Sequence, residues 1–137
     1  MKIALRVTSL LFIASVAVLL STCSLAAVSI SDRISMFIQS LNGDRTDTYK
    51  NLDPNLPNPS AFDASYWEIY FPSGQKTFVY TSSNGTSNPS DVEGYIAGSG
   101  YPSTLHKFVM VNVGSGADDW RINSLQHGAT FAHYPNL

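Results

Sequence analysis

The chain has 137 residues, of which 44% are hydrophobic and 13% are charged, and its formal net charge is −2. This length suits one domain, and a low charge content with many aromatic residues is typical of a folded chain and not of a disordered one. The sequence has no cluster of lysine and arginine, which argues against nucleic acid as a partner.

The first 26 residues have the pattern of a secretory signal peptide. Lys2 and Arg6 precede an apolar run over residues 10–20, and small residues follow up to Ala26. The run is shorter than the roughly 20 apolar residues that a transmembrane helix needs. We therefore predict cleavage after Ala26, no membrane span, and a periplasmic or secreted location. Residues 27–137 then form the domain, with six basic and ten acidic side chains and a formal charge of −4.

A lipid anchor at Cys23 is the alternative for this N-terminal segment. Residues 20–23, "LSTC", are similar to a bacterial lipoprotein cleavage box, in which the cysteine carries the lipid. Thr22 departs from that pattern. Cys23 is the chain's single cysteine, so residues 27–137 have no disulfide and depend on a buried core for stability.

The clearest helix in the sequence covers residues 28–41. Its apolar residues recur at helical spacing, which places them on one face. Ser29 and Asp32 are spaced as a capping pair, and Gly43 is expected to end the helix in a left-handed conformation. A second, short helix is expected over residues 44–52, and a third is expected to begin at Ser60, after a proline-rich stretch.

Strand patterns follow the helices. Four segments rich in β-branched and aromatic residues are separated by turn signals, and they cover residues 76–83, 91–99, 104–113 and 119–126. Helices first and strands afterwards predict an α+β domain with a mostly antiparallel sheet.

This order of elements resembles the nuclear-transport-factor-2-like superfamily, which includes polyketide-cyclase-like and ketosteroid-isomerase-like domains. The similarity involves "LNGD" at residues 41–44, "SYWEIYFPSG" at residues 65–74, and the closing pair of strands over residues 106–126. The resemblance implies N-terminal helices packed on a strongly curved, cone-like sheet around an apolar pocket. It also implies a homodimer, because many members of the superfamily dimerise.

Asp118 and Asp119 are the first candidate for chemistry, because paired carboxylates beside Arg121 could move protons or hold a metal. On an extended chain, however, adjacent side chains point to opposite faces, and Asp and Gly are favoured in turns. We predict that both carboxylates form the solvated corner of a turn. Trp120 and Ile122 are then expected to face the core, with Arg121 on the opposite face.

A general base would have to come from a buried histidine or carboxylate, as in the enzymes of this superfamily. The candidates are His106, Glu68 and Glu93, because Asp32 and Asp63 are better explained as helix caps. His106 is expected on the same strand face as Phe108 and Met110. The histidines lie too far apart to suggest a metal site, and no motif indicates a cofactor.

A dense group of aromatic residues before the sheet suggests either a core or the lining of an apolar pocket. The residues expected to contact a ligand are Tyr49, Tyr66, Trp67 and Tyr70, together with His106. The sequence thus predicts an exported, non-catalytic module that binds a small apolar ligand or dimerises. The alternative is an isomerase- or dehydratase-like enzyme that uses a pocket histidine or carboxylate as its base.

Overall fold

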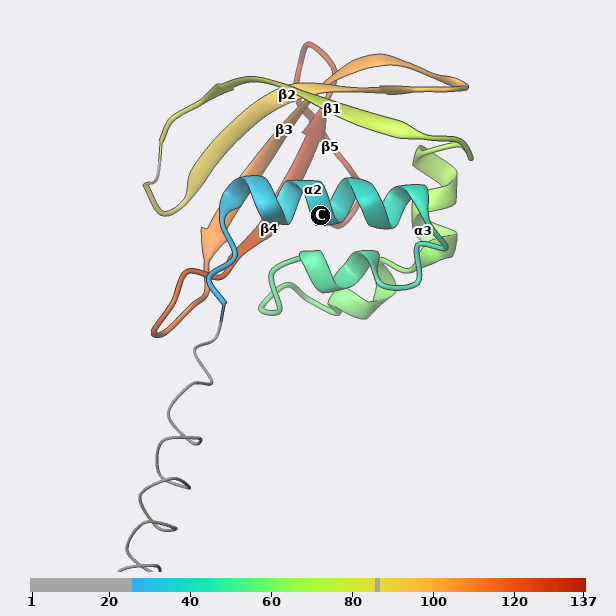
Figure 1. The fold of residues 1–137 in the computed structure, drawn as a ribbon. Helices are drawn as coiled ribbons and strands as arrows, with labels where there is room; N and C mark the ends of the chain where they lie inside the picture. Colours follow the sequence, from blue (N-terminus) through green and yellow to red (C-terminus); the bar gives the residue numbers. More distant parts are fainter. Residues whose placement is uncertain (1–25, 86) are drawn as a thin grey trace, which may run out of the picture.

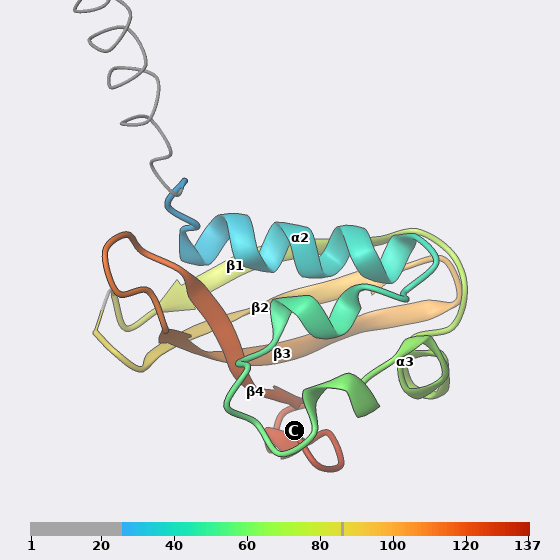
Figure 2. The same cartoon turned by 90° about the horizontal axis from the view of Figure 1, so that it is seen from below.

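Helix α2 (Ile30–Asn42) lies across one face of a five-stranded antiparallel sheet in the computed structural model, which describes residues 26–85 and 87–137 (Figure 1). The helices and the sheet form the α+β architecture that the sequence predicts. Short helical segments lie beside α2 on the same side of the sheet, as Figure 2 shows from below. The opposite face of the sheet is not covered by any of the described helices.

The predicted capping pair starts α2. The Ser29 hydroxyl accepts a hydrogen bond from the Asp32 N–H at 3.1 Å, and the Asp32 carboxylate accepts one from the Ser29 N–H at 3.4 Å. The helix ends at Gly43, whose N–H donates to the carbonyls of Gln39 and Ser40. The φ angle of Gly43 is −95°, so the predicted left-handed end is wrong. The apolar stripe of α2 is buried and consists of Ile34, Phe37, Ile38 and Leu41.

The helix predicted over residues 44–52 is replaced by a turn and a single 3-10 segment, η1 (Thr48–Asn51). The cause is Asp44, whose carboxylate accepts from both the N–H and the hydroxyl of Thr46, at 3.1 and 2.9 Å. This local hydrogen bonding competes with a helical first turn. Arg45 between them has a φ of 66°, which no α-helix accommodates.

The third predicted helix begins later than expected. A 3-10 turn, η2 (Pro59–Ala61), comes first, and α3 (Ala64–Tyr70) follows it. Asp63 caps α3, as predicted, because its carboxylate accepts from the Tyr66 N–H at 3.1 Å.

The sheet is a simple meander in which each strand pairs with the next one along the chain. The strands are β1 (Lys76–Ser83), β2 (Ser90–Gly98), β3 (Tyr101–Asn112), β4 (Trp120–His127) and β5 (Ala132–His133). The first four confirm the predicted strands to within three residues at either end. β5 was not predicted, because two residues carry no periodicity.

The core lies between α2, α3 and the inner face of the sheet. Phe37 of α2 is fully buried, and its ring contacts Trp67 of α3 and Phe108 of β3 edge to face, with centroids 5.2 and 5.9 Å apart. Trp120 and Ile122 also face this core, as predicted, with exposed fractions of 5% and 0%. Burial of such side chains is the main stabilising contribution in a domain without a disulfide.

Two predictions concern the N-terminal segment. The signal peptide over residues 1–26 and the lipid anchor at Cys23 fall outside the described residues, apart from Ala26 itself. Among residues 26–85 and 87–137, no helix has the length and apolar content needed to cross a membrane.

Candidate functional site

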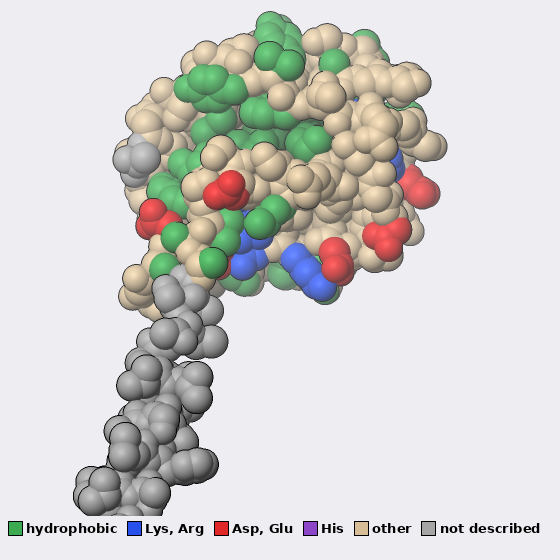
Figure 3. Space-filling model, in the orientation of Figure 1, with side chains coloured by type: hydrophobic (Ala, Val, Ile, Leu, Met, Phe, Trp, Pro, Cys, Tyr) green, Lys and Arg blue, Asp and Glu red, His purple; other side chains and the backbone are tan. Residues whose placement is uncertain are grey.

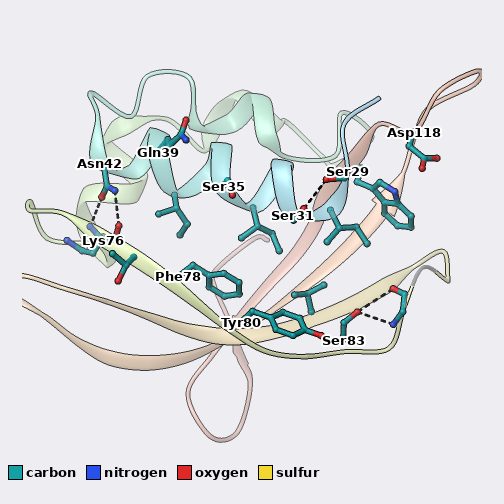
Figure 4. A pocket seen from close by; sticks show the side chains of 17 residues that line it. Ser29, Ser31, Ser35, Gln39, Asn42, Lys76, Phe78, Tyr80, Ser83 and Asp118 are labelled. Atoms are coloured by element: carbon teal, nitrogen blue, oxygen red, sulfur yellow. Dashed lines mark hydrogen bonds between the residues drawn. The ribbon is translucent and has the colours of Figure 1, made fainter. Parts of the chain in front are cut away.

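An apolar groove of about 870 Å³ lies between α2 and the first two strands of the sheet (Figure 4). This volume is within the range of about 300–1,000 Å³ that is typical of small-molecule sites. Figure 3 shows hydrophobic side chains gathered on this side of the molecule, where β1 lies above α2. The apolar lining consists of Ile30, Ile34, Ile38, Phe78, Tyr80, Val92 and Trp120.

Gly94 explains why the groove is not filled. It lies on the inner face of β2 opposite Tyr80 of β1, and its missing side chain makes room for the ring of Phe78. A Cβ atom at Gly94 would meet that ring at 2.4 Å. Phe78 therefore lies over β2, edge to face with Phe108 at 5.4 Å. The space below α2 remains open.

The helix side of the groove carries small polar groups. Ser31 and Ser35 are exposed residues of α2 and line the groove beside its buried isoleucines. Their hydroxyl groups can donate or accept hydrogen bonds, while their small size leaves space between helix and strand. The lining is thus apolar at its base and has neutral polar groups along one edge (Figure 4).

The two ends of the groove have satisfied polar groups. At one end, the Asn42 side chain accepts from the Lys76 N–H at 2.6 Å and donates to its carbonyl at 2.8 Å. The Lys76 ammonium turns away and donates to the carbonyls of Pro72 and Gly74, at 2.6 and 2.8 Å. At the other end, the Asp118 carboxylate accepts from the Asn112 side chain at 2.7 Å. The Lys76 ammonium and the Asp118 carboxylate are thus both hydrogen-bonded within the protein, and binding in the groove does not require an ionic ligand.

The predicted base His106 lies elsewhere, buried in an aromatic cluster. Its Nδ1–H donates to the Thr104 carbonyl at 2.9 Å, and its Nε2 accepts from the Tyr134 hydroxyl at 2.8 Å. Because a carbonyl can only accept, Nδ1 carries the proton. Burial lowers the pKa of His106 to about 4, and nearby His127 adds to this effect, while the Thr104 hydrogen bond opposes it.

His106 is therefore neutral at pH 7, and both of its nitrogens are engaged. It shares its strand face with Phe108 and Met110, as predicted, and all three are fully buried. It does not line the groove. This environment is that of a structural histidine whose hydrogen bonds are satisfied.

Three of the four aromatic residues expected to contact a ligand gather around the same cluster. Tyr134 is central: its ring contacts those of Tyr70, Trp67 and His106, with centroids 5.1, 6.2 and 6.0 Å apart. Tyr66 packs on Tyr70, and its hydroxyl donates to the Pro135 carbonyl at 2.7 Å. Burial raises the pKa of Tyr66 to about 12.

The fourth residue, Tyr49, is half-buried and packs against the hydrophobic core. None of the four predicted ligand-contacting aromatics lines the groove. Tyr134, at the centre of the cluster, was not singled out in the sequence, because it lies in a short irregular tail with no periodic pattern.

The candidate carboxylates are also separated from the groove. Glu68 is exposed on α3, and Glu93 lies on the outer face of β2, where it accepts from the Ser82 hydroxyl at 3.4 Å. Asp32 and Asp63 are the helix caps that the sequence predicts. Glu68 and Glu93 therefore do not meet His106 at a shared site.

Asp118 and Asp119 point in different directions, as predicted, but only Asp118 is a solvated corner. The Asp119 carboxylate accepts from Arg33 Nη2 at 2.7 Å and from Arg121 Nε and Nη2, each at 2.9 Å. The prediction that both residues are solvated is wrong for Asp119. Hydrogen bonds from Arg121 and the charges of both arginines lower the pKa of this carboxyl.

The role of Asp119 is structural. Arg33 is 6% exposed and also donates to the Trp120 carbonyl at 2.7 Å, so it joins α2 to the start of β4. Arg33 was not recognised in the sequence because it lies among the apolar positions of an amphipathic helix. Within the described ranges, no group of three or more His, Cys, Asp or Glu residues could hold a metal ion.

No family model, no curated protein and no solved structure matches the sequence or the fold.

Proposed function

We propose that the chain is a small exported module that holds an apolar ligand in the groove between α2 and β1. The observation that carries this proposal is the open volume of about 870 Å³ with isoleucine, phenylalanine, valine and tryptophan side chains along it. A ligand with an extended or flat apolar body and a neutral polar group suits this lining. The exported location follows from the N-terminal pattern in the sequence.

The burial of the lining supports a preformed site. Ile34 and Val92 are each 3% exposed and Trp120 is 5% exposed, so the base of the groove is anchored in the core. Tyr80 lines the rim of the groove and is 59% exposed, so its side chain is available to cover a ligand. A rigid apolar base lowers the ordering cost of binding, because few side chains have to be immobilised.

The membership of the nuclear-transport-factor-2-like superfamily is part of this proposal, with the cone-like sheet that the resemblance implies. The order of α2, the short helices and the antiparallel meander supports membership of the superfamily. The enzymatic alternative receives less support, because none of His106, Glu68 and Glu93 lines the groove. His106 and Glu93 also have different hydrogen-bond partners, Tyr134 and Ser82.

The test is a fluorescence titration of residues 27–137, which contain the whole described fold, with 1-anilinonaphthalene-8-sulfonate. A dye in the groove lies beside Trp120 and should quench tryptophan emission while its own emission rises. Ser35→Phe places a ring in the groove from an exposed helix position and should weaken dye binding at least about tenfold, equivalent to about 1.4 kcal/mol. The matched control is Met36→Phe, at the adjacent exposed position of α2 that does not line the groove. Equal binding by both variants would refute the groove as the site.

A further inference from the structure

The free edge of β1 offers a surface for a second protein strand, independently of the apolar ligand. β1 is the first strand of the sheet order, so one of its sides has no partner strand among the described residues (Figure 2). Natural edge strands are commonly protected by charged residues, proline or a β-bulge. Residues 77–80 contain no charged residue and no proline, and they precede the register shift between Tyr80 and Ser82.

Asn42 shows which backbone groups face this edge. Its side chain bonds both the N–H and the carbonyl of Lys76, as a neighbouring strand would do (Figure 4). In an antiparallel sheet, alternate residues direct both backbone groups to the same side. The N–H and carbonyl groups of Phe78 and Tyr80 therefore face the open edge as well.

The length of the free segment is limited at both ends. Asn42 already occupies the position at Lys76, and the pairing register between β1 and β2 shifts between Tyr80 and Ser82. Such a bulge bends a strand and ends regular pairing. Phe78 and Tyr80 thus form a two-position stretch that is open for pairing.

Exposed apolar side chains cluster at the same edge. Of the five large hydrophobic residues that are exposed in the described ranges, Val79 at 60% and Tyr80 at 59% lie on β1, and Tyr95 at 41% lies beside them on β2. Val79 and Tyr95 are paired neighbours on the outer face of the sheet. Backbone groups without a partner strand, next to exposed apolar side chains, indicate an interface.

We propose that β1 pairs antiparallel with β1 of a second copy of this chain, around a two-fold axis at Val79. In this register Phe78 of each copy lies opposite Tyr80 of the other, so the two open positions of one strand meet those of its partner. Registers centred on Phe78 or Tyr80 would instead need Lys76, which Asn42 occupies, or Ser82, which lies beyond the bulge. Phe78 and Tyr80 of one copy can thus pair with Tyr80 and Phe78 of the other in one register only.

The side chains fit the same arrangement. Phe78 and Tyr80 form aromatic cross-strand pairs on the groove face, and the two Val79 side chains meet on the outer face beside Tyr95. Ser31 and Ser35 flank the groove on α2, so small uncharged residues face the approaching copy. The pairing continues each sheet into its partner.

The register is tested by disulfide cross-linking of residues 27–137, which contain no cysteine. Residues directly opposite each other in an antiparallel pair have Cβ atoms about 5 Å apart. Val79→Cys should therefore form a covalent dimer under mild oxidation at micromolar concentration. Thr77→Cys is the matched control, since two such cysteines would be about 13 Å apart, four residues along the paired strands. A monomeric Val79→Cys chain, or equal cross-linking of Thr77→Cys, would overturn the proposal.

Sedimentation velocity tests the association itself. The unsubstituted chain should dimerise, and Val79→Lys should raise the dimer dissociation constant at least about tenfold by placing like charges at the axis. Val109→Lys adds the same charge on the outer face of β3 and should leave dimerisation unchanged. Because Val79 points away from the groove, Val79→Lys should still bind the dye, which separates this proposal from the ligand proposal. An unsubstituted chain that stays monomeric at 100 μM would contradict the pairing.

Discussion

The burial of His106 predicts that the stability of the domain falls between pH 7 and pH 5. The folded pKa is about 4, whereas an unfolded histidine has a pKa of about 6.5. As the pH falls below 6.5, the unfolded chain binds a proton that the folded chain rejects, so the free energy of unfolding decreases until the pH reaches about 4. Above about pH 7.5 both states are almost entirely neutral and this contribution is constant.

The magnitude follows from the two pKa values. The full difference of about 2.5 pKa units corresponds to roughly 3 kcal/mol, and about 2 kcal/mol of it is lost between pH 7 and pH 5. Urea unfolding followed by the fluorescence of the two buried tryptophans, Trp67 and Trp120, measures this slope. His106→Gln is less stable at pH 7, because the Thr104 and Tyr134 hydrogen bonds are disturbed, but its side chain cannot be protonated.

The comparison of slopes decides whether this reasoning holds. The His106→Gln chain should lose about 2 kcal/mol less than the unsubstituted chain between pH 7 and pH 5. An His106→Gln chain whose stability falls as steeply as that of the unsubstituted chain would refute the assignment of this pH dependence to His106.

Two further predictions use matched pairs of substitutions and the same unfolding assay. Asp119→Asn should cost about 2–3 kcal/mol, because it leaves the buried Arg33 without its carboxylate partner. This value is at the low end for a broken ion pair, since the Asp119 side chain is 32% exposed. Asp118→Asn should cost less than about 0.5 kcal/mol, and equal losses for the two substitutions would contradict the ion-pair account. Gly94→Ala should cost about 1–3 kcal/mol because its Cβ would meet both the Phe78 ring and the Val79 carbonyl oxygen, whereas Gly116→Ala has open space and should be neutral. A Gly94→Ala chain as stable as the unsubstituted one would contradict this close packing at Gly94.

The regular elements were predictable because their signals are local. The stripe of α2 and its Ser29–Asp32 cap, and the alternation along the first four strands, are visible in the sequence and reappear in the structure. The 3-10 segments were not predictable from periodicity, because Asp44 diverts the chain through hydrogen bonds to Thr46 that a helical pattern does not include.

The candidate site was less predictable than the fold. The aromatic residues of α3 drew attention by their density, but packing against Tyr134, 64 residues beyond Tyr70, determines their place in the core. The groove depends on an absence, the missing side chain of Gly94, and on a small residue, Ser35, in a helix that otherwise reads as a core element. Neither has a sequence signature, since both effects arise only when α2 and β1 are brought together.

The most direct test of the ligand proposal is to map the bound dye by the NMR chemical shifts of residues 27–137. The account predicts that 1-anilinonaphthalene-8-sulfonate perturbs the methyl signals of Ile34, Ile38 and Val92 and the indole signal of Trp120, with little change at Tyr134. Perturbations centred on Tyr134 and the α3 aromatics, with the groove isoleucines unaffected, would contradict it.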